Sequence, residues 1–186
     1  MKTADGVYFS PDDYASFWRR LLIYGIDGLA VGAAWSVVAV ILLTALPFNR
    51  MTFNLILAIF GLVAFWYLII LKRSKIGTAG YRIGGVRIVG LDGQPPSLST
   101  LTFRMLFALL GPVYWLLDLA WVIGDKHRQT LRDKLAHTYV VKAKAVPVGA
   151  GRIIVRYYDI NCFIFSFKEI EAPTTTTADA LPDSAN

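Results

Sequence analysis

One long apolar run in the sequence carries two ionisable residues whose placement is its most informative feature. The run extends from Leu21 to Leu46 with Asp27 as its only charged residue, and Arg20 immediately precedes it. It exceeds the roughly 20 residues that an α-helix needs to cross a bilayer. An ionised group inside a span costs at least about 2.5–3.5 kcal/mol, so Asp27 is expected to have either a partner or a function.

Two kinds of chemistry fit an acid in this position. Asp27 could bind protons or cations in a small antiporter or channel, with Arg20 tuning its proton affinity. Alternatively, both charges could hold other segments against the helix at the inner leaflet, or the basic face could bind a lipid headgroup or another subunit. The two residues share one helical stripe, but about two turns separate them, which is too far for them to pair with each other.

Each of the two charges is therefore expected to meet a residue from another segment of the chain. The candidate partners of Arg20 are Asp133 and Asp118. The candidate partner of Asp27 is Arg104, because a guanidinium group suits a buried carboxylate.

The composition favours a membrane protein. Hydrophobic residues make up 55% of the chain and charged residues only 17%, and the mean hydropathy is +0.51. The net charge of +6 would suggest nucleic acid as a partner of a soluble protein. Here the bases flank apolar segments, so cytoplasmic anchoring explains them and no nucleic-acid partner is expected. The first apolar run is too long for a cleaved signal peptide and is expected to act as the targeting signal itself.

The apolar runs predict the helical elements. A first helix is expected from about Tyr14 to Leu46, capped by residues 10–13 and ended by Pro47. A second, uncharged run from Phe53 to Leu71 forms an antiparallel hairpin with it, and Trp18, Trp66 and Tyr67 are expected as interfacial anchors.

A third apolar region, residues 101–123, is broken at Gly111-Pro112 into two pieces that are too short to span. If all three runs crossed, the basic segment after Ile123 would lie outside, against the positive-inside rule. Two spans plus a re-entrant hairpin, with both termini cytoplasmic, are therefore favoured. A true third span with the C-terminal part outside is the alternative.

Short strands are predicted around the third region. Residues 86–89 precede an Asp92-Gly93 turn, and residues 137–141 and 152–158 also have strand character. Residues 163–167 are apolar and are interpreted as a strand or a membrane-surface contact. The fold class is thus an all-α integral membrane protein with two transmembrane helices, a re-entrant or third helical segment, and a small cytoplasmic β-rich appendage.

Small residues on the first helix indicate a packing face. Gly28 and Gly32 form a G-x-x-x-G pattern that Gly25 and Ser36 extend, and such faces allow close approach of another helix. Packing against the second helix is one interpretation, and an interface with a second protomer or another subunit is the other.

Three stretches of the chain together resemble the RDD family, which is named for one arginine and two aspartates. The first is residues 17–20 followed by 26–28; the second is residues 77–82 with 85–89 and 92–93; the third is residues 128–136 before the strand at 138–141. On this resemblance the three named residues are Arg20, Asp27 and Asp133. The middle stretch departs from the family's G-x-T-x-G-K pattern, because it has Tyr81-Arg82 where a lysine is common.

The resemblance implies a domain organisation and a broad function. Residues 14–143 would form the membrane domain after a polar segment at 1–13, followed by a strand-rich extension at 144–172 and a disordered tail at 173–186. The family resemblance suggests transport of cations, protons or another ligand across the inner or plasma membrane. The extension favours the alternative, an accessory or scaffold subunit that forms a homo-oligomer or binds other membrane subunits.

No enzymatic motif accompanies these features. His127 and His137 lie apart without an H-E-x-x-H pattern, and the sequence has no P-loop, dinucleotide fingerprint or nucleophile elbow. A single cysteine, Cys162, provides neither an intrachain disulfide nor a metal cluster. We therefore expect no enzyme activity, no cofactor and no bound metal.

Overall fold

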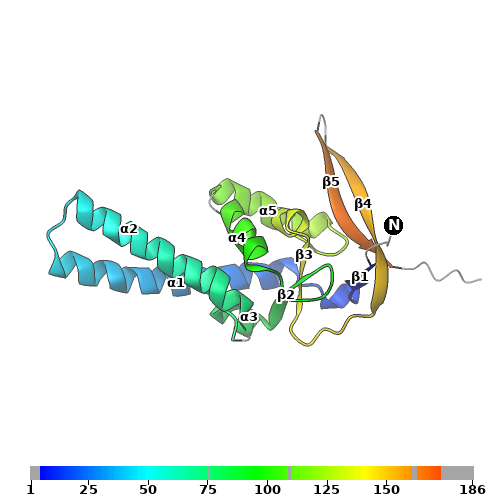
Figure 1. Cartoon of the computed structure of the whole chain (residues 1–186), viewed down its shortest axis with the longest axis horizontal. Helices are drawn as coiled ribbons and strands as arrows, with labels where there is room; N and C mark the ends of the chain where they lie inside the picture. Colours follow the sequence, from blue (N-terminus) through cyan, green and yellow to red (C-terminus); the bar gives the residue numbers. More distant parts are fainter. Residues whose placement is uncertain (1–4, 75, 109, 161–162, 173–186) are drawn as a thin grey trace, which may run out of the picture.

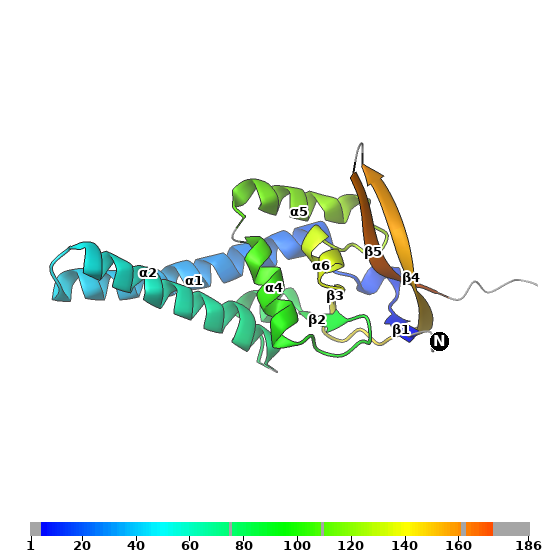
Figure 2. The same cartoon turned by 45° about the horizontal axis from the view of Figure 1, so that its top comes forward.

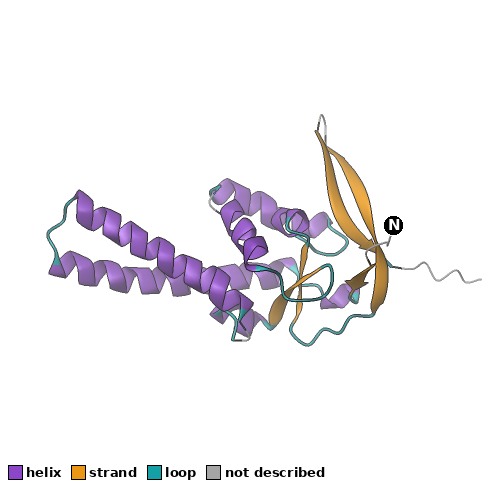
Figure 3. Ribbon diagram, in the orientation of Figure 1, coloured by secondary structure: helices purple, strands orange, loops and turns teal. Residues whose placement is uncertain are grey.

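The computed structural model describes residues 5–74, 76–108, 110–160 and 163–172. A long helical hairpin extends to one side of the molecule, and most of the strands lie at the opposite end (Figures 1 and 3). The hairpin consists of α1 (Phe17–Ala45) and α2 (Arg50–Phe65), and the π-helical segment η2 (Trp66–Leu71) continues α2. The predicted tail at 173–186 lies outside the described residues.

Side-chain caps fix the ends of the hairpin helices. The Ser16 side chain accepts a hydrogen bond from the backbone N–H of Arg19, and the Asn49 side chain accepts one from that of Thr52. The predicted start near Tyr14 is wrong, because residues 11–13 form a separate 3-10 turn (η1, Pro11–Asp13) and Tyr14 pairs with Val141 in an isolated β-bridge.

The third apolar region forms two helices, as the sequence predicts. They are α4 (Leu98–Ala108) and α5 (Pro112–Gly124), which are separated at Gly111, where the backbone φ is +98°. Figure 2 shows α5 alongside the first half of α1, and α4 contacts η2. The shorter helix α3 (Ala79–Gly84) packs against α1, and the shorter helix α6 (Leu131–Leu135) packs against α5.

Two small antiparallel sheets complete the fold. Strand β2 (Val86–Gly90) pairs with β3 (Thr138–Lys142), with Ile88 opposite Val140. In the other sheet, β4 (Gly149–Ile160) lies between β1 (Asp5–Tyr8) and β5 (Phe163–Glu171). The predicted strands are therefore confirmed, but the all-α description is too narrow, because one sheet forms within residues 14–143.

The buried apolar residues gather where the base of the hairpin meets the sheets. We call α3, β2, α6 and β3, with their connecting residues 77–90 and 128–142, the basal layer. One core cluster joins α1 and η2 to this layer, and a second joins the layer to β1 and β5. By contrast, large apolar side chains on the rest of the hairpin are exposed, including Leu29, Val40, Met51 and Leu62.

Candidate functional site

Asp133 is the centre of a buried ion cluster on α6. A capping box holds the residue in place: Asp133 N donates to Thr130 Oγ1 at 3.2 Å, and Thr130 N donates to Asp133 Oδ2 at 3.3 Å. Arg20 Nη1 on α1 lies 2.6 Å from Asp133 Oδ2, and Arg104 Nη1 on α4 lies 2.5 Å from Oδ1. One carboxylate thus joins three helices that are distant in the sequence.

Further hydrogen bonds fix both arginines. Arg20 Nη2 donates to the carbonyl oxygen of Arg128 at 2.7 Å, and Arg20 Nε donates to that of Ala15 at 3.2 Å. Arg104 Nη1 donates to the hydroxyl of Thr138, the first residue of β3. All three nitrogens of the Arg20 guanidinium thus donate to protein groups, and its side chain is only 1% exposed.

The ion cluster keeps Asp133 charged. Burial by itself raises the pKa of the Asp133 carboxyl, but Arg104 and Arg20 outweigh this and hold its pKa well below the ordinary value. The charged form is thus stabilised by interactions that exist only in the folded chain.

Asp27 is buried in a second network about two turns further along α1. Asp27 Oδ1 accepts hydrogen bonds from the Tyr67 hydroxyl at 3.2 Å and the Gly80 N–H at 2.8 Å, and Oδ2 accepts one from the Thr78 hydroxyl at 2.9 Å. Lys72 Nζ lies 4.0 Å from Oδ2. Both carboxylate oxygens are therefore occupied by groups from η2 and α3.

The spacing of Thr78 and Gly80 follows from this network. Thr78 is the N-cap of α3, so one hydroxyl both caps the helix and binds Asp27. A Cβ on Gly80 would lie 2.5 Å from the carbonyl oxygen of Ile23 and 2.7 Å from Asp27 Oδ1. The motif at residues 77–82 is thus a docking element that brings the N-terminus of α3 against α1.

The π-helical segment η2 supplies the remaining partners. Tyr67 donates its hydroxyl hydrogen to Asp27 and accepts one from the Ala79 N–H at 2.9 Å. Lys72 follows η2 and lies 4.5 Å from the centroid of the Tyr81 ring. Burial lowers the pKa of the Lys72 ammonium to about 7, although the neighbouring Asp27 carboxylate acts in the opposite direction.

The five charged residues that were predicted to form one site lie in three separate groups. Arg20 and Arg104 share Asp133, while Asp27 and Asp118 each have other partners. Arg20 pairs with Asp133, one of its two predicted partners. The prediction that Arg104 pairs with Asp27 is wrong, because α4 directs Arg104 to Asp133. Asp118 binds Arg132 instead, with Arg132 Nε 3.0 Å from Oδ2.

The glycine face of α1 is not closely packed against any other segment in the described part of the chain. A Cβ added at Gly25, Gly28 or Gly32 would meet no atom within 4 Å. Ser36 Oγ donates to the carbonyl oxygen of Gly32 within the same helix at 2.8 Å. The interpretation that these glycines pack against the second helix is therefore wrong, and a partner outside this chain stays a prediction.

A third cluster, around Lys134, joins the C-terminal hairpin to the basal layer and was not predicted from the sequence. Lys134 Nζ lies 2.6 Å from Asp125 Oδ1 and 2.5 Å from Glu169 Oε1, and it donates to the Tyr158 hydroxyl at 3.0 Å. Burial disfavours the charged lysine, but hydrogen bonds to Asp125, Glu169 and Tyr158 raise its pKa. The buried ammonium is thus a specific link between α6 and the β4–β5 hairpin.

Replacing Lys134 with methionine is expected to loosen the β4–β5 hairpin. Asp125 would lose its cation but keep the backbone N–H groups of His127 and Gln129, and Glu169 would keep Arg156, so we expect a loss of about 1–3 kcal/mol. Chymotrypsin should then cleave residues 149–171 faster in detergent solution. Lys142→Met is the matched control, because Lys142 is 43% exposed and lies 3.7 Å from Asp13. Equal cleavage of the two variants would contradict this assignment.

These observations define a class of protein. It has two apolar helices of membrane-spanning length, and one arginine and two aspartates connect the base of this helical hairpin to segments that are distant in the sequence. The sequence model of the RDD family matches residues 14–137, and the chain belongs to this family. The matched range contains all three of these residues and ends before β4. No curated protein and no solved structure matches the chain. Among the residues that the structure describes, no group of three or more His, Cys, Asp or Glu residues could hold a metal ion.

Proposed function

We propose that this chain is a multi-pass membrane scaffold, in which the buried charges fasten a cytoplasmic layer to a transmembrane hairpin. The observation that carries the proposal is the enclosure of Asp27: the Tyr67 and Thr78 hydroxyls and the Gly80 N–H donate to its two oxygens, and its side chain is almost completely buried. A group that takes up and releases cations needs access and exchangeable partners. Here the described hydrogen-bonding partners are Thr78 and Gly80 of the docked segment and Tyr67 of η2.

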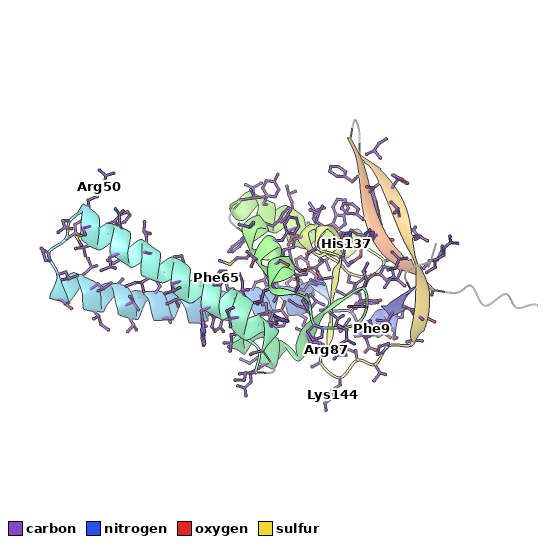
Figure 4. The ribbon with its side chains drawn as sticks, in the orientation of Figure 1. Phe9, Arg50, Phe65, Arg87, His137 and Lys144 are labelled. Atoms are coloured by element: carbon purple, nitrogen blue, oxygen red, sulfur yellow. The ribbon has the colours of Figure 1, made fainter. Side chains whose placement is uncertain are left out.

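Two spans and a re-entrant pair fit the arrangement of the helices. Residues 17–45 and 50–71 are long and apolar enough to cross a bilayer. Helices α4 and α5, with 11 and 13 residues, are shorter than a span requires. Figure 4 shows Arg50 at the far tip of the hairpin and Arg87 and Lys144 at its base. More basic side chains lie near the base of the hairpin than at its tip. This distribution supports cytoplasmic termini in an inner or plasma membrane.

The exposed surfaces offer places for a partner. The glycine face of α1, with Gly25, Gly28 and Gly32 uncovered in the described chain, suits a second protomer or another membrane subunit. The β4–β5 hairpin extends beyond the family region and suits a cytoplasmic partner. An accessory role in a larger assembly follows from these two surfaces.

Asp27→Asn tests the scaffold proposal. The amide replaces one acceptor oxygen by a donor group and removes the negative charge near Lys72. We expect the free energy of unfolding to fall by about 1–3 kcal/mol and the variant to accumulate at lower levels in membranes. Asp92→Asn is the control, because Asp92 is exposed and its described hydrogen bond is a single one, accepted by Oδ1 from Gln94 N. Unchanged stability and abundance of Asp27→Asn would contradict the proposal.

A specific pair of residues favours transport as the second candidate function. Lys72 has a pKa of about 7 because it is buried, and its ammonium lies 4.0 Å from Asp27 Oδ2. This lysine would gain and lose a proton near neutral pH beside a buried carboxylate. In this alternative Asp27→Asn would abolish proton or cation flux through liposomes and leave folding intact.

A further inference from the structure

A cavity of about 370 Å³ lies where the second long helix meets the basal layer. Its wall is formed by the residues that follow η2, by α3 and β2, by the prolines that precede α4, and by the start of α4. Lys72 and Tyr81 line it, and Lys72 Nζ also lies 4.0 Å from Asp27 Oδ2, whereas Asp27 is not among the lining residues. No function assigned above uses this cavity.

The charged residues that line the cavity are all basic. They are Lys72, Arg73, Arg82 and Arg87, and the described lining contains no aspartate or glutamate. Arg73 and Arg82 are exposed and form no ion pair with the residues that the structure describes. Arg87 Nη2 donates to the carbonyl oxygen of Ala145 at 2.9 Å, which positions the guanidinium without neutralising it. The cavity therefore suits an anion.

Most of the remaining wall is apolar. Ile76, Val86, Pro95 and Leu101 contribute to it, and Ile76 is largely exposed. A free phosphate would leave this apolar surface in water. A ligand with a phosphate group next to a hydrocarbon portion would use both the bases and the apolar wall.

We infer that this cavity binds the phosphate headgroup of an anionic phospholipid, with the upper part of the acyl chains against the apolar wall. The position of the cavity supports this, because it begins at Lys72, directly after the apolar segment that ends at Leu71. A bilayer crossed by that segment would present its headgroups at this level. The inference rests on the proposed membrane insertion, and it is independent of whether the chain acts as a scaffold or as a transporter.

The test measures lipid retained by the full-length chain in a neutral detergent, by native mass spectrometry. Phosphatidylglycerol should be retained more strongly than phosphatidylcholine by the unmodified chain, a comparison that needs no variant. Arg73→Gln with Arg82→Gln should weaken phosphatidylglycerol binding roughly 25-fold, since each base near an anionic lipid is worth about a fivefold change. Arg50→Gln with Arg152→Gln is the matched control with the same loss of charge outside the cavity lining, and it should retain lipid within about twofold.

Three results would overturn the inference. They are equal retention of the two lipids by the unmodified chain, equal loss of phosphatidylglycerol in the two double variants, and displacement of phosphatidylglycerol by an equimolar amount of inorganic phosphate. The last result would assign the cavity to a soluble phosphate. Ion flux by the unmodified chain would contradict the scaffold proposal and leave the lipid result unchanged, so the two failures are distinguishable.

Discussion

Asp133→Asn is expected to be the most damaging single substitution in the buried networks. The asparagine would leave Arg20 and Arg104 buried beside a neutral side chain, where their positive charges would face each other without compensation. Removing one partner from a buried ion pair costs about 3–5 kcal/mol. Thermal unfolding in detergent should therefore shift down by at least about 6 °C, and much of the protein should be lost from the membrane fraction.

Asp118→Asn provides the control for the loss of a negative charge. Asp118 contacts a single arginine, Arg132, and its side chain is 13% exposed, so we expect about half the loss of stability. The same rank order should hold for Asp133→Ala and Asp118→Ala. If Asp133→Asn is as stable as Asp118→Asn, the three-helix junction at Asp133 does not hold the basal layer in place.

Gly80→Ala is expected to have the second largest effect. The new Cβ would lie 2.5 Å from the backbone oxygen of Ile23 and 2.7 Å from Asp27 Oδ1, and real Cβ atoms essentially never approach other atoms this closely. Helix α3 would have to move away from α1, which would also break the hydrogen bond from Gly80 N to Asp27. Overpacking and the lost bond together predict about 2–4 kcal/mol of destabilisation in thermal or denaturant unfolding.

Gly61→Ala is the matched control for this substitution. Gly61 lies within α2, and a Cβ there would meet no atom within 4 Å in the described structure. Alanine favours a helix over glycine by about 1 kcal/mol, so this variant should be neutral or slightly more stable. Equal stability of Gly80→Ala and Gly61→Ala would show that α3 does not pack closely against α1.

Local patterns in the sequence predict most of the elements. Apolar length predicts the two long helices, the Gly111-Pro112 pair predicts the break between α4 and α5, and strand residues predict β2 and β3. The apolar pattern predicts a start of the first helix near Tyr14, whereas α1 begins at Phe17. The pattern contains no information on the β-bridge between Tyr14 and Val141. Tertiary pairing decided that boundary.

The partners of the charged residues were only partly predictable. Helical spacing correctly indicates that Arg20 and Asp27 do not pair with each other, and the family resemblance identifies Asp133 as a third key residue. The spacing contains no information on which carboxylate Arg104 reaches, since the orientation of α4 is set by packing against η2 and α5. The hydroxyl and backbone donors around Asp27 were missed, although the motif at residues 77–82 contains two of them, Thr78 and Gly80.

Ion flux through proteoliposomes that contain the full-length chain tests the scaffold account most directly. Proton and sodium gradients would be imposed at pH values on either side of the Lys72 pKa of about 7, with Asp27→Asn in parallel liposomes. The account predicts that neither protein conducts above empty liposomes and that Asp27→Asn is less stable than the unmodified chain. Sustained flux through the unmodified chain that Asp27→Asn abolishes, at unchanged stability, would contradict the account and establish Asp27 as a transport residue.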